Sequence, residues 1–115
     1  VENHGDFYVS DLVALNQQTP GLGLFLDTGN CYLIGESCLP AFEAGAPYII
    51  GTHFKDHFVK PNPQTLMFEL DGAALGAGDV PLRECFRKRL CIPGLRLMYG
   101  WSSCAANLIL QSCWL

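Results

Sequence analysis

The sequence predicts an α/β fold, a partial (β/α)8 TIM barrel with parallel strands and outer helices. One observation is that short apolar runs alternate with helix-forming segments, an order typical of a parallel sheet. Another is that Glu2, Asp27 and His53 each follow such a run, at intervals of 25 and 26 residues. A barrel of about 250 residues has roughly 31 residues per unit, and its active site lies where the carboxyl ends of the strands meet.

The composition describes a folded, mildly acidic chain of 115 residues. Half of the residues are hydrophobic and 16% are charged, which excludes a disordered chain and predicts a single core. The net charge of −4 argues against nucleic acid or an anionic membrane as partner, because both require a basic surface. A small-molecule sugar or sugar-like substrate remains compatible.

No basic segment followed by an apolar stretch opens the chain, and no apolar run reaches the roughly 18 residues of a membrane span. We therefore expect a cytoplasmic protein. The chain starts at Val1 inside an apolar strand, which predicts a piece of a longer protein. The cysteines form no CxxC pair, so buried free thiols are expected rather than a disulfide scaffold or a zinc site: Cys31, Cys38, Cys85, Cys91, Cys104 and Cys113.

The first part of the chain is expected to run strand, helix, strand. Residues 1–4 are typical of the end of a strand. Ser10 is expected to cap the following helix, which ends before the Thr-Pro-Gly sequence at 19–21. The apolar run LGLFLD at 22–27 suits a parallel strand that is buried on both faces.

A second helix and a second strand follow at 39–46 and 47–54. Pro40 in the first turn and Gly45 near the end favour the helix, and PYIIGTHF is an apolar strand. Residues 57–72 break the alternation, because two prolines in KPNP indicate a loop, with LMFELDG as a short extended excursion. A loop of this length in a compact domain is usually a lid or a binding loop.

The helix signal returns after this loop. Asp79 is expected to cap a helix with Pro81 in its first turn, and basic residues gather near the carboxyl end of that helix. GLRLMY at 94–99 is a third apolar run and predicts a further strand. The uncharged segment after Gly100 fits the pattern least well, and a helix over 104–112 is the preferred assignment.

Glu2, Asp27 and His53 together form a candidate site for a divalent ion, because two carboxylates and one imidazole suit Mn²⁺, Mg²⁺, Co²⁺ or Zn²⁺. Each residue also has a simpler explanation. A histidine at a strand end is often a hydrogen-bonded structural residue, and an aspartate before Thr-Gly is often a turn former or helix cap. Glu2 could be merely solvated. The even spacing on successive strands favours the metal site.

Further polar residues at the same mouth are candidates to bind substrate: Asn3, His4, Asn30, Lys55 and Asp56. Lys55 could bind a hydroxyl or a phosphate and Asp56 could orient it, although a surface ion pair would explain both. His57 is expected to belong to the loop. The glycine-rich LGAGD at 75–79 offers backbone amides to an anion, but a tight turn explains it equally well.

Four motifs, ENHG, LDTGN, HFKDH and LGAGDVPL, occur in an order that resembles the second half of the sugar phosphate isomerase/epimerase superfamily, the xylose isomerase-like TIM barrels. That family includes ketose 3-epimerases, hydroxypyruvate isomerases and inosose dehydratases. The resemblance covers residues 1–98 and implies about the last four β/α units of the barrel. HFKD after an apolar strand, together with LDTGN, is its most specific part.

The resemblance implies a divalent metal ion bound by Glu, Asp, His and a second Glu from four consecutive strands. By motif, the first three ligands are Glu2, Asp27 and His53, and Glu2 is also the catalytic base. In isomerases of this family the ion holds adjacent oxygens of the sugar, and two glutamates move a proton through an enediolate. A homo-oligomer is compatible with the resemblance.

The chain departs from the family pattern at its carboxyl end. The second glutamate is expected near Tyr99 or Gly100, yet no acidic residue follows Glu84. The segment 99–115 is therefore interpreted as an atypical tail, frameshifted or truncated, and the chain alone is expected to be inactive. Two alternatives stay open: a metal-dependent lyase such as a cyclitol dehydratase on the same scaffold, and a non-catalytic remnant. A repair nuclease is disfavoured because the chain is acidic.

Overall fold

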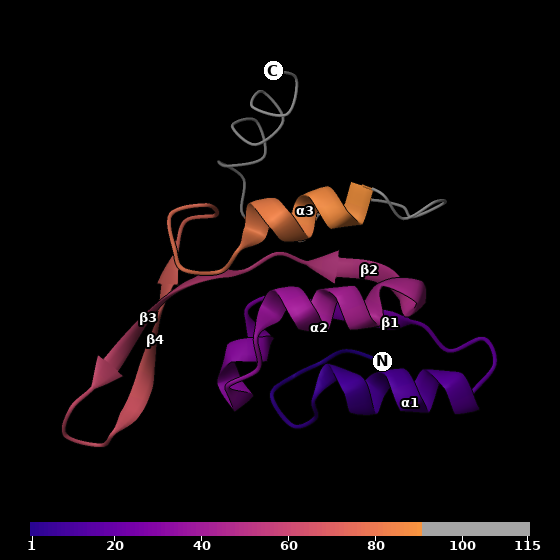
Figure 1. The fold of residues 1–115 in the computed structure, drawn as a ribbon, viewed down its shortest axis with the longest axis horizontal. Coiled ribbons are helices and arrows are strands. Elements are labelled where there is room, and N and C mark those ends of the chain that lie inside the picture. The colour runs from indigo at the N-terminus through magenta and orange to yellow at the C-terminus, as the bar shows by residue number, and fades with distance from the viewer. Residues whose placement is uncertain (91–115) are drawn as a thin grey trace.

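The body of the molecule combines a parallel pair of strands with helices that pack against it (Figure 1). The structure is a computed structural model that describes residues 1–90. Its α/β class agrees with the expectation from the sequence, since the described residues contain one parallel and one antiparallel strand pair. The elements of the body are α1 (Val9–Gln18), β1 (Leu24–Asp27), α2 (Cys38–Gly45), β2 (Ile49–His53) and α3 (Leu82–Leu90), with short 3-10 helices at Asn30–Ile34 and Ala46–Tyr48.

The expected strands at the start of the chain lie side by side. β1 and β2 are parallel, and their register sets Asp27 directly opposite His53 at the carboxyl ends of both strands. Glu2 forms a parallel bridge with Phe25 on the other side of β1. Three consecutive strand segments therefore run in the same direction, and their carboxyl ends share one edge.

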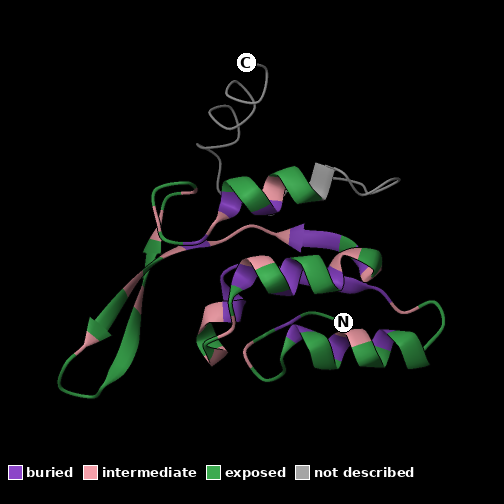
Figure 2. Ribbon diagram, in the orientation of Figure 1, coloured by how far each residue is buried: buried purple, intermediate pink, exposed green. Residues whose placement is uncertain are grey.

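One face of this sheet is covered by helices. Leu24, Leu26 and Ile49 pack in the core with side chains of α1, α2 and α3, and α2 contacts both other helices. On the opposite face, the Phe25 ring lies so close over Gly51 that a Cβ atom there would be 2.5 Å from it. Figure 2 shows the buried residues gathered in this body.

A β-hairpin occupies residues 57–72, so the loop expected around KPNP was wrong, whereas the extended excursion expected for LMFELDG is confirmed as a strand. β3 (Asp56–Asn62) and β4 (Met67–Ala73) pair antiparallel and project from the body (Figure 1). The prolines do not prevent this, because Pro61 stands on a two-stranded ribbon where it has one free edge. The turn is closed by the Asn62 side chain, whose Oδ1 accepts hydrogen bonds from the amides of Gln64 and Thr65.

Two expected helix caps were also wrong. Ser10 lies inside α1, which begins at Val9, and the Val9 amide donates to the carboxylate of Glu36 at 3.1 Å. Asp79 precedes α3 by more than one residue, because the helix begins at Leu82. The carboxylate of Asp79 instead accepts a hydrogen bond of 2.7 Å from the amide of Val59 in the hairpin. Both changes involve tertiary partners that a local capping rule does not include.

Cys31, Cys38 and Cys85 are buried free thiols, as expected. The remaining cysteines, the strand expected at 94–99, the helix expected at 104–112 and the position of the second glutamate lie outside the described residues. Among residues 1–90, no helix combines the length and the apolar character needed to cross a bilayer.

Candidate metal centre

Glu2, Asp27 and His53 meet at the carboxyl edge of the parallel strands. Ligand atoms of these three side chains all lie within 4.8 Å of one another. Asp27 and His53 face each other from paired positions of β1 and β2, and Glu2 comes from the neighbouring bridged segment. The structure thus brings together the three residues that the spacing of the sequence singled out.

Asp27 is the buried centre of this group and has no exposed surface. One carboxylate oxygen, Oδ1, accepts hydrogen bonds from the amides of Gly29 at 2.9 Å and Asn30 at 3.1 Å. This is the turn-forming role expected of an aspartate before Thr-Gly, and here it starts the 3-10 helix Asn30–Ile34. The turn holds the carboxylate in one orientation, with Oδ2 directed toward β2.

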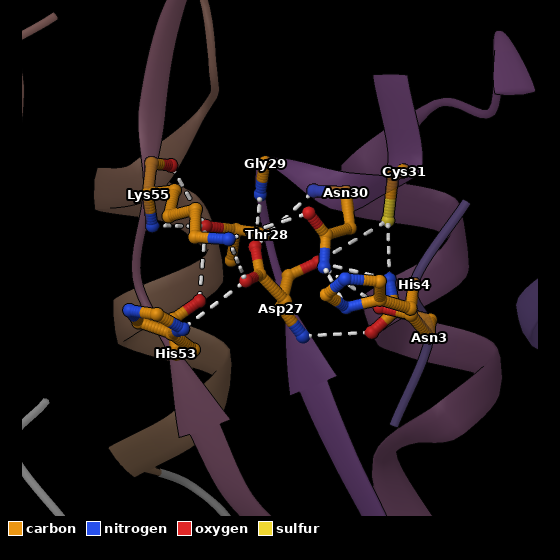
Figure 3. Close-up of polar contacts among 9 residues, drawn as sticks. All are labelled: Asn3, His4, Asp27, Thr28, Gly29, Asn30, Cys31, His53 and Lys55. Carbon is orange, nitrogen blue, oxygen red and sulfur yellow. Dashed lines mark hydrogen bonds and ion pairs between the residues drawn. The ribbon is translucent and has the colours of Figure 1, made fainter. Parts of the chain in front are cut away.

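The second oxygen of Asp27 faces cationic and ionisable groups. Oδ2 lies 2.8 Å from the Nζ atom of Lys55 and 3.2 Å from the Nδ1 atom of His53 (Figure 3). Within residues 1–90, Oδ2 is a buried oxygen that receives no hydrogen bond in good geometry, so these contacts are ionic in character. A buried carboxylate oxygen without a hydrogen bond costs free energy unless a cation neutralises it.

This arrangement fits a divalent ion. In an octahedral site with bonds of about 2.1 Å, ligand atoms are about 3 Å apart in cis positions and about 4.2 Å apart in trans positions. Ligand atoms that already lie within 4.8 Å therefore need only small side-chain movements to share one ion. The buried Oδ2 of Asp27 supplies the anionic oxygen that such an ion would neutralise.

Asn3 and Asn30 build the frame around Asp27. The Asn3 side chain accepts a hydrogen bond from the Asp27 amide at 2.7 Å and donates to the Asp27 carbonyl at 2.9 Å. Asn30 donates through Nδ2 to the Asn3 carbonyl at 2.9 Å, and the same nitrogen lies 3.4 Å from Nδ1 of His4. Asn3 is almost fully buried, so its amide is committed to the backbone of β1 rather than to a ligand.

Asp56, also expected to contact substrate, has both carboxylate oxygens occupied by backbone amides. Oδ2 accepts from Gly76 at 2.8 Å and from Gly78 at 3.0 Å, and Oδ1 accepts from His57 and Val80. The glycine-rich segment 75–79 does bind an anion through its amides, as its composition suggested, and that anion is the side chain of Asp56. These hydrogen bonds attach the first residue of the hairpin to the loop that precedes α3.

Thr28 and Gly29 are structural partners of the site that the sequence reasoning did not single out. The Thr28 hydroxyl accepts a hydrogen bond from the Lys55 amide and donates to the Lys55 carbonyl, both at 2.9 Å. A Cβ atom on Gly29 would lie 2.4 Å from Nε2 of His57 and 2.7 Å from Cβ of Lys55. One signal in the sequence could have pointed to them: in LDTGN they stand between the candidate metal ligand Asp27 and the candidate substrate-binding residue Asn30.

Tyr32 lies in the 3-10 helix Asn30–Ile34, which follows Thr28 and Gly29. Burial is the main cause that raises the pKa of Tyr32 to about 12. The phenol therefore remains protonated at neutral pH, and its hydroxyl faces the backbone carbonyl of Asp79 at 3.5 Å.

Comparisons with known proteins found no relative. No family model matches the chain, and no curated protein or solved structure is significantly similar to it.

Proposed function

We propose that this chain provides three ligands of a divalent metal centre of the kind used by sugar isomerases and epimerases of the xylose isomerase-like barrels. The observation that carries the proposal is the meeting of Glu2, Asp27 and His53 at the carboxyl ends of three neighbouring parallel segments. Active sites of β/α barrels lie at this edge of the strands.

The exposed sheet face supports a partial barrel as the architecture. Helices cover the face of β1 that carries Leu24 and Leu26, whereas Phe25 and Asp27 alternate to the other face. Ile50 packs over Gly23 on that side and is still 61% exposed. In a closed barrel this face would point to the interior, where apolar side chains fill the centre.

The proposed chemistry is proton transfer at a carbon next to a carbonyl group. A bound divalent ion would supply Lewis acidity that stabilises negative charge on the substrate oxygens. Glu2 is the exposed carboxylate of the group, so it is accessible to act as the base that removes the proton. His4 and Lys55 are at least partly exposed and both contact the buried side chain of Asn30, so these two are the residues proposed to hold hydroxyl groups of a polyhydroxylated substrate.

The lack of any acidic residue after Glu84 favours a second candidate. Epimerisation needs one group to remove a proton and another to return it, and among residues 1–90 Glu2 is the exposed carboxylate of the candidate metal centre. The alternative is therefore a metal-binding remnant without net turnover, or a lyase on the same scaffold that eliminates water after the first proton transfer.

Metal binding is tested by titrating Mn²⁺ into the full chain and into His53→Ala and Asp27→Asn, with binding heat or electron paramagnetic resonance as readout. We expect the wild type to bind and each variant to bind at least about tenfold more weakly, because even residues that only support a metal ligand contribute this much. Asp71→Asn is the matched control for Asp27→Asn, since Asp71 is an exposed carboxylate of the hairpin and is not among the three ligands. Equal affinities of wild type and His53→Ala would contradict the proposed site.

The reaction is tested by incubating the Mn²⁺-loaded chain in D₂O with a panel of ketoses, ketose phosphates, hydroxypyruvate and inososes. Exchange of a substrate C–H proton for deuterium, lost in Glu2→Gln, would support Glu2 as base. Net epimerisation or isomerisation would contradict the remnant, and water elimination would favour the lyase. No exchange with any substrate, despite metal binding, would favour the remnant.

A further inference from the structure

Lys55 already places a positive charge where the divalent ion would bind. Its Nζ atom lies 2.8 Å from Oδ2 of Asp27, and the Asp27 side chain is fully buried. A buried carboxylate requires a nearby cation, because desolvation strongly disfavours an unpaired charge. Among the described residues, Lys55 and His53 are the ion-pairing partners of this carboxylate, and Lys55 is the closer of the two, at 2.8 Å against 3.2 Å.

The ion and the lysine need the same oxygen. Oδ1 of Asp27 is occupied by the amides of Gly29 and Asn30, which leaves Oδ2 for a cation. A divalent ion bound to Oδ2 would lie within a few ångströms of the Lys55 ammonium, where their repulsion is large. Both cations therefore cannot hold this oxygen equally well at the same time.

The geometry allows Lys55 to leave without disturbing the backbone. Hydrogen bonds with the Thr28 hydroxyl fix both the amide and the carbonyl of Lys55. The side chain is 36% exposed, and Oδ1 of Asn30 is a second acceptor at 3.4 Å from Nζ. Displacement is then a rotation of the lysine stem toward Asn30 and solvent.

We propose that Lys55 is the resident counter-cation of Asp27, and that a divalent ion binds by replacing the Lys55 ammonium at Oδ2. This inference rests on the proposed metal centre. It makes Lys55 a positioning residue that neutralises the site when no ion is bound and weakens the apparent affinity for the ion, because each binding event must break the Lys55–Asp27 pair.

The test is Mn²⁺ affinity of the full chain carrying Lys55→Met, which keeps the apolar stem and removes the charge. We expect Lys55→Met to bind Mn²⁺ about tenfold more tightly than the wild type, because the ion no longer has to displace the Lys55 ammonium from its ion pair with Asp27. Lys55→Arg retains the charge and should stay within a few-fold of the wild type. Lys60→Met, which removes an exposed ammonium, should leave the affinity unchanged.

Thermal unfolding provides a readout that does not depend on the binding titration. Without metal, Lys55→Met should unfold at a lower temperature than the wild type, because Asp27 has lost its counter-cation. Saturating Mn²⁺ should then raise the melting temperature of Lys55→Met by more than it raises that of the wild type. This readout also shows whether the variant folds.

The outcomes separate this inference from the proposed function. Metal binding by the wild type that is weakened in His53→Ala, together with equal or weaker binding by Lys55→Met, overturns the exchange and leaves the metal centre intact. Tighter binding by both Lys55→Met and Lys60→Met also overturns it, because net charge would then be the cause. No binding of Mn²⁺ by the wild type or by Lys55→Met overturns both proposals.

Discussion

The side-chain amide of Asn3 pairs with the backbone of Asp27 on both sides, accepting from its N–H at 2.7 Å and donating to its carbonyl at 2.9 Å. The Asn3 side chain takes the place that the backbone of a neighbouring strand would have, since such a strand would form the same two kinds of hydrogen bond. The pair fixes the segment that carries Glu2 against β1. The distance between Glu2 and Asp27 at the candidate metal centre therefore depends on the buried side chain of Asn3.

Replacing Asn3 by alanine should destabilise the fold. The change removes both hydrogen bonds that Asn3 makes with the buried backbone of Asp27, which costs about 2–4 kcal/mol of unfolding free energy. Urea denaturation followed by circular dichroism measures it. Gln17→Ala, which removes an exposed amide from α1, is the control and should change the unfolding free energy by less than about 0.5 kcal/mol. Similar losses of unfolding free energy in Asn3→Ala and Gln17→Ala would show that the hydrogen bonds between Asn3 and Asp27 do not stabilise the fold.

Asp56 should be required for the attachment of the hairpin. Four backbone amides donate to its carboxylate, so Asp56→Asn places an NH₂ group against some of these donors and should cost about 3 kcal/mol or more. Asp71→Asn is the matched control on the same hairpin, where an exposed ion pair with Lys60 contributes less than about 1 kcal/mol. Chemical denaturation of both variants compares them, and equal stability would contradict the anchoring role.

Gly78 should not tolerate a side chain. A Cβ atom there would lie 2.3 Å from Oδ1 of Asp56 and 2.6 Å from the carbonyl oxygen of His57, and the backbone oxygen cannot move aside easily. We expect Gly78→Ala to lower the unfolding free energy by about 1–3 kcal/mol. At Gly72 a Cβ atom would meet nothing within 4 Å, so Gly72→Ala should stay within about 0.5 kcal/mol of the wild type. The melting temperatures of the two variants decide this.

The contribution of Glu36 to the stability of the fold should be larger at acidic pH than at neutral pH. Burial raises the pKa of the Glu36 carboxyl above its usual value, despite the hydrogen bond that it accepts from the Val9 amide. A raised pKa in the folded state means that this group contributes stability which is fully present below its pKa in the unfolded chain. That contribution is lost as the pH rises through the folded pKa.

Carbon-detected NMR titration of the Glu36 carboxyl should give a midpoint above that of glutamate in an unstructured peptide. In Glu36→Gln, this part of the pH dependence of the unfolding free energy should disappear. A midpoint at or below the peptide value would contradict the expectation.

The local pattern of the sequence was enough to predict the α/β class, the strands that carry the candidate ligands and the meeting of Glu2, Asp27 and His53. Parallel strands bring their carboxyl ends to one edge, so polar residues that follow consecutive strands must lie near one another. The buried free thiols also follow from composition alone.

Only the tertiary structure decided what the neighbouring polar residues do. Asn3 and Asp56 looked like ligand-binding residues because they stand beside the candidate ligands, yet backbone groups at least 20 residues away engage Asn3 and most of the Asp56 carboxylate. Lys55 instead contacts the buried oxygen of Asp27. Periodicity places a side chain on a face and at an end of a strand, but its hydrogen-bond partners depend on how distant segments pack, and a short polar motif does not contain that information.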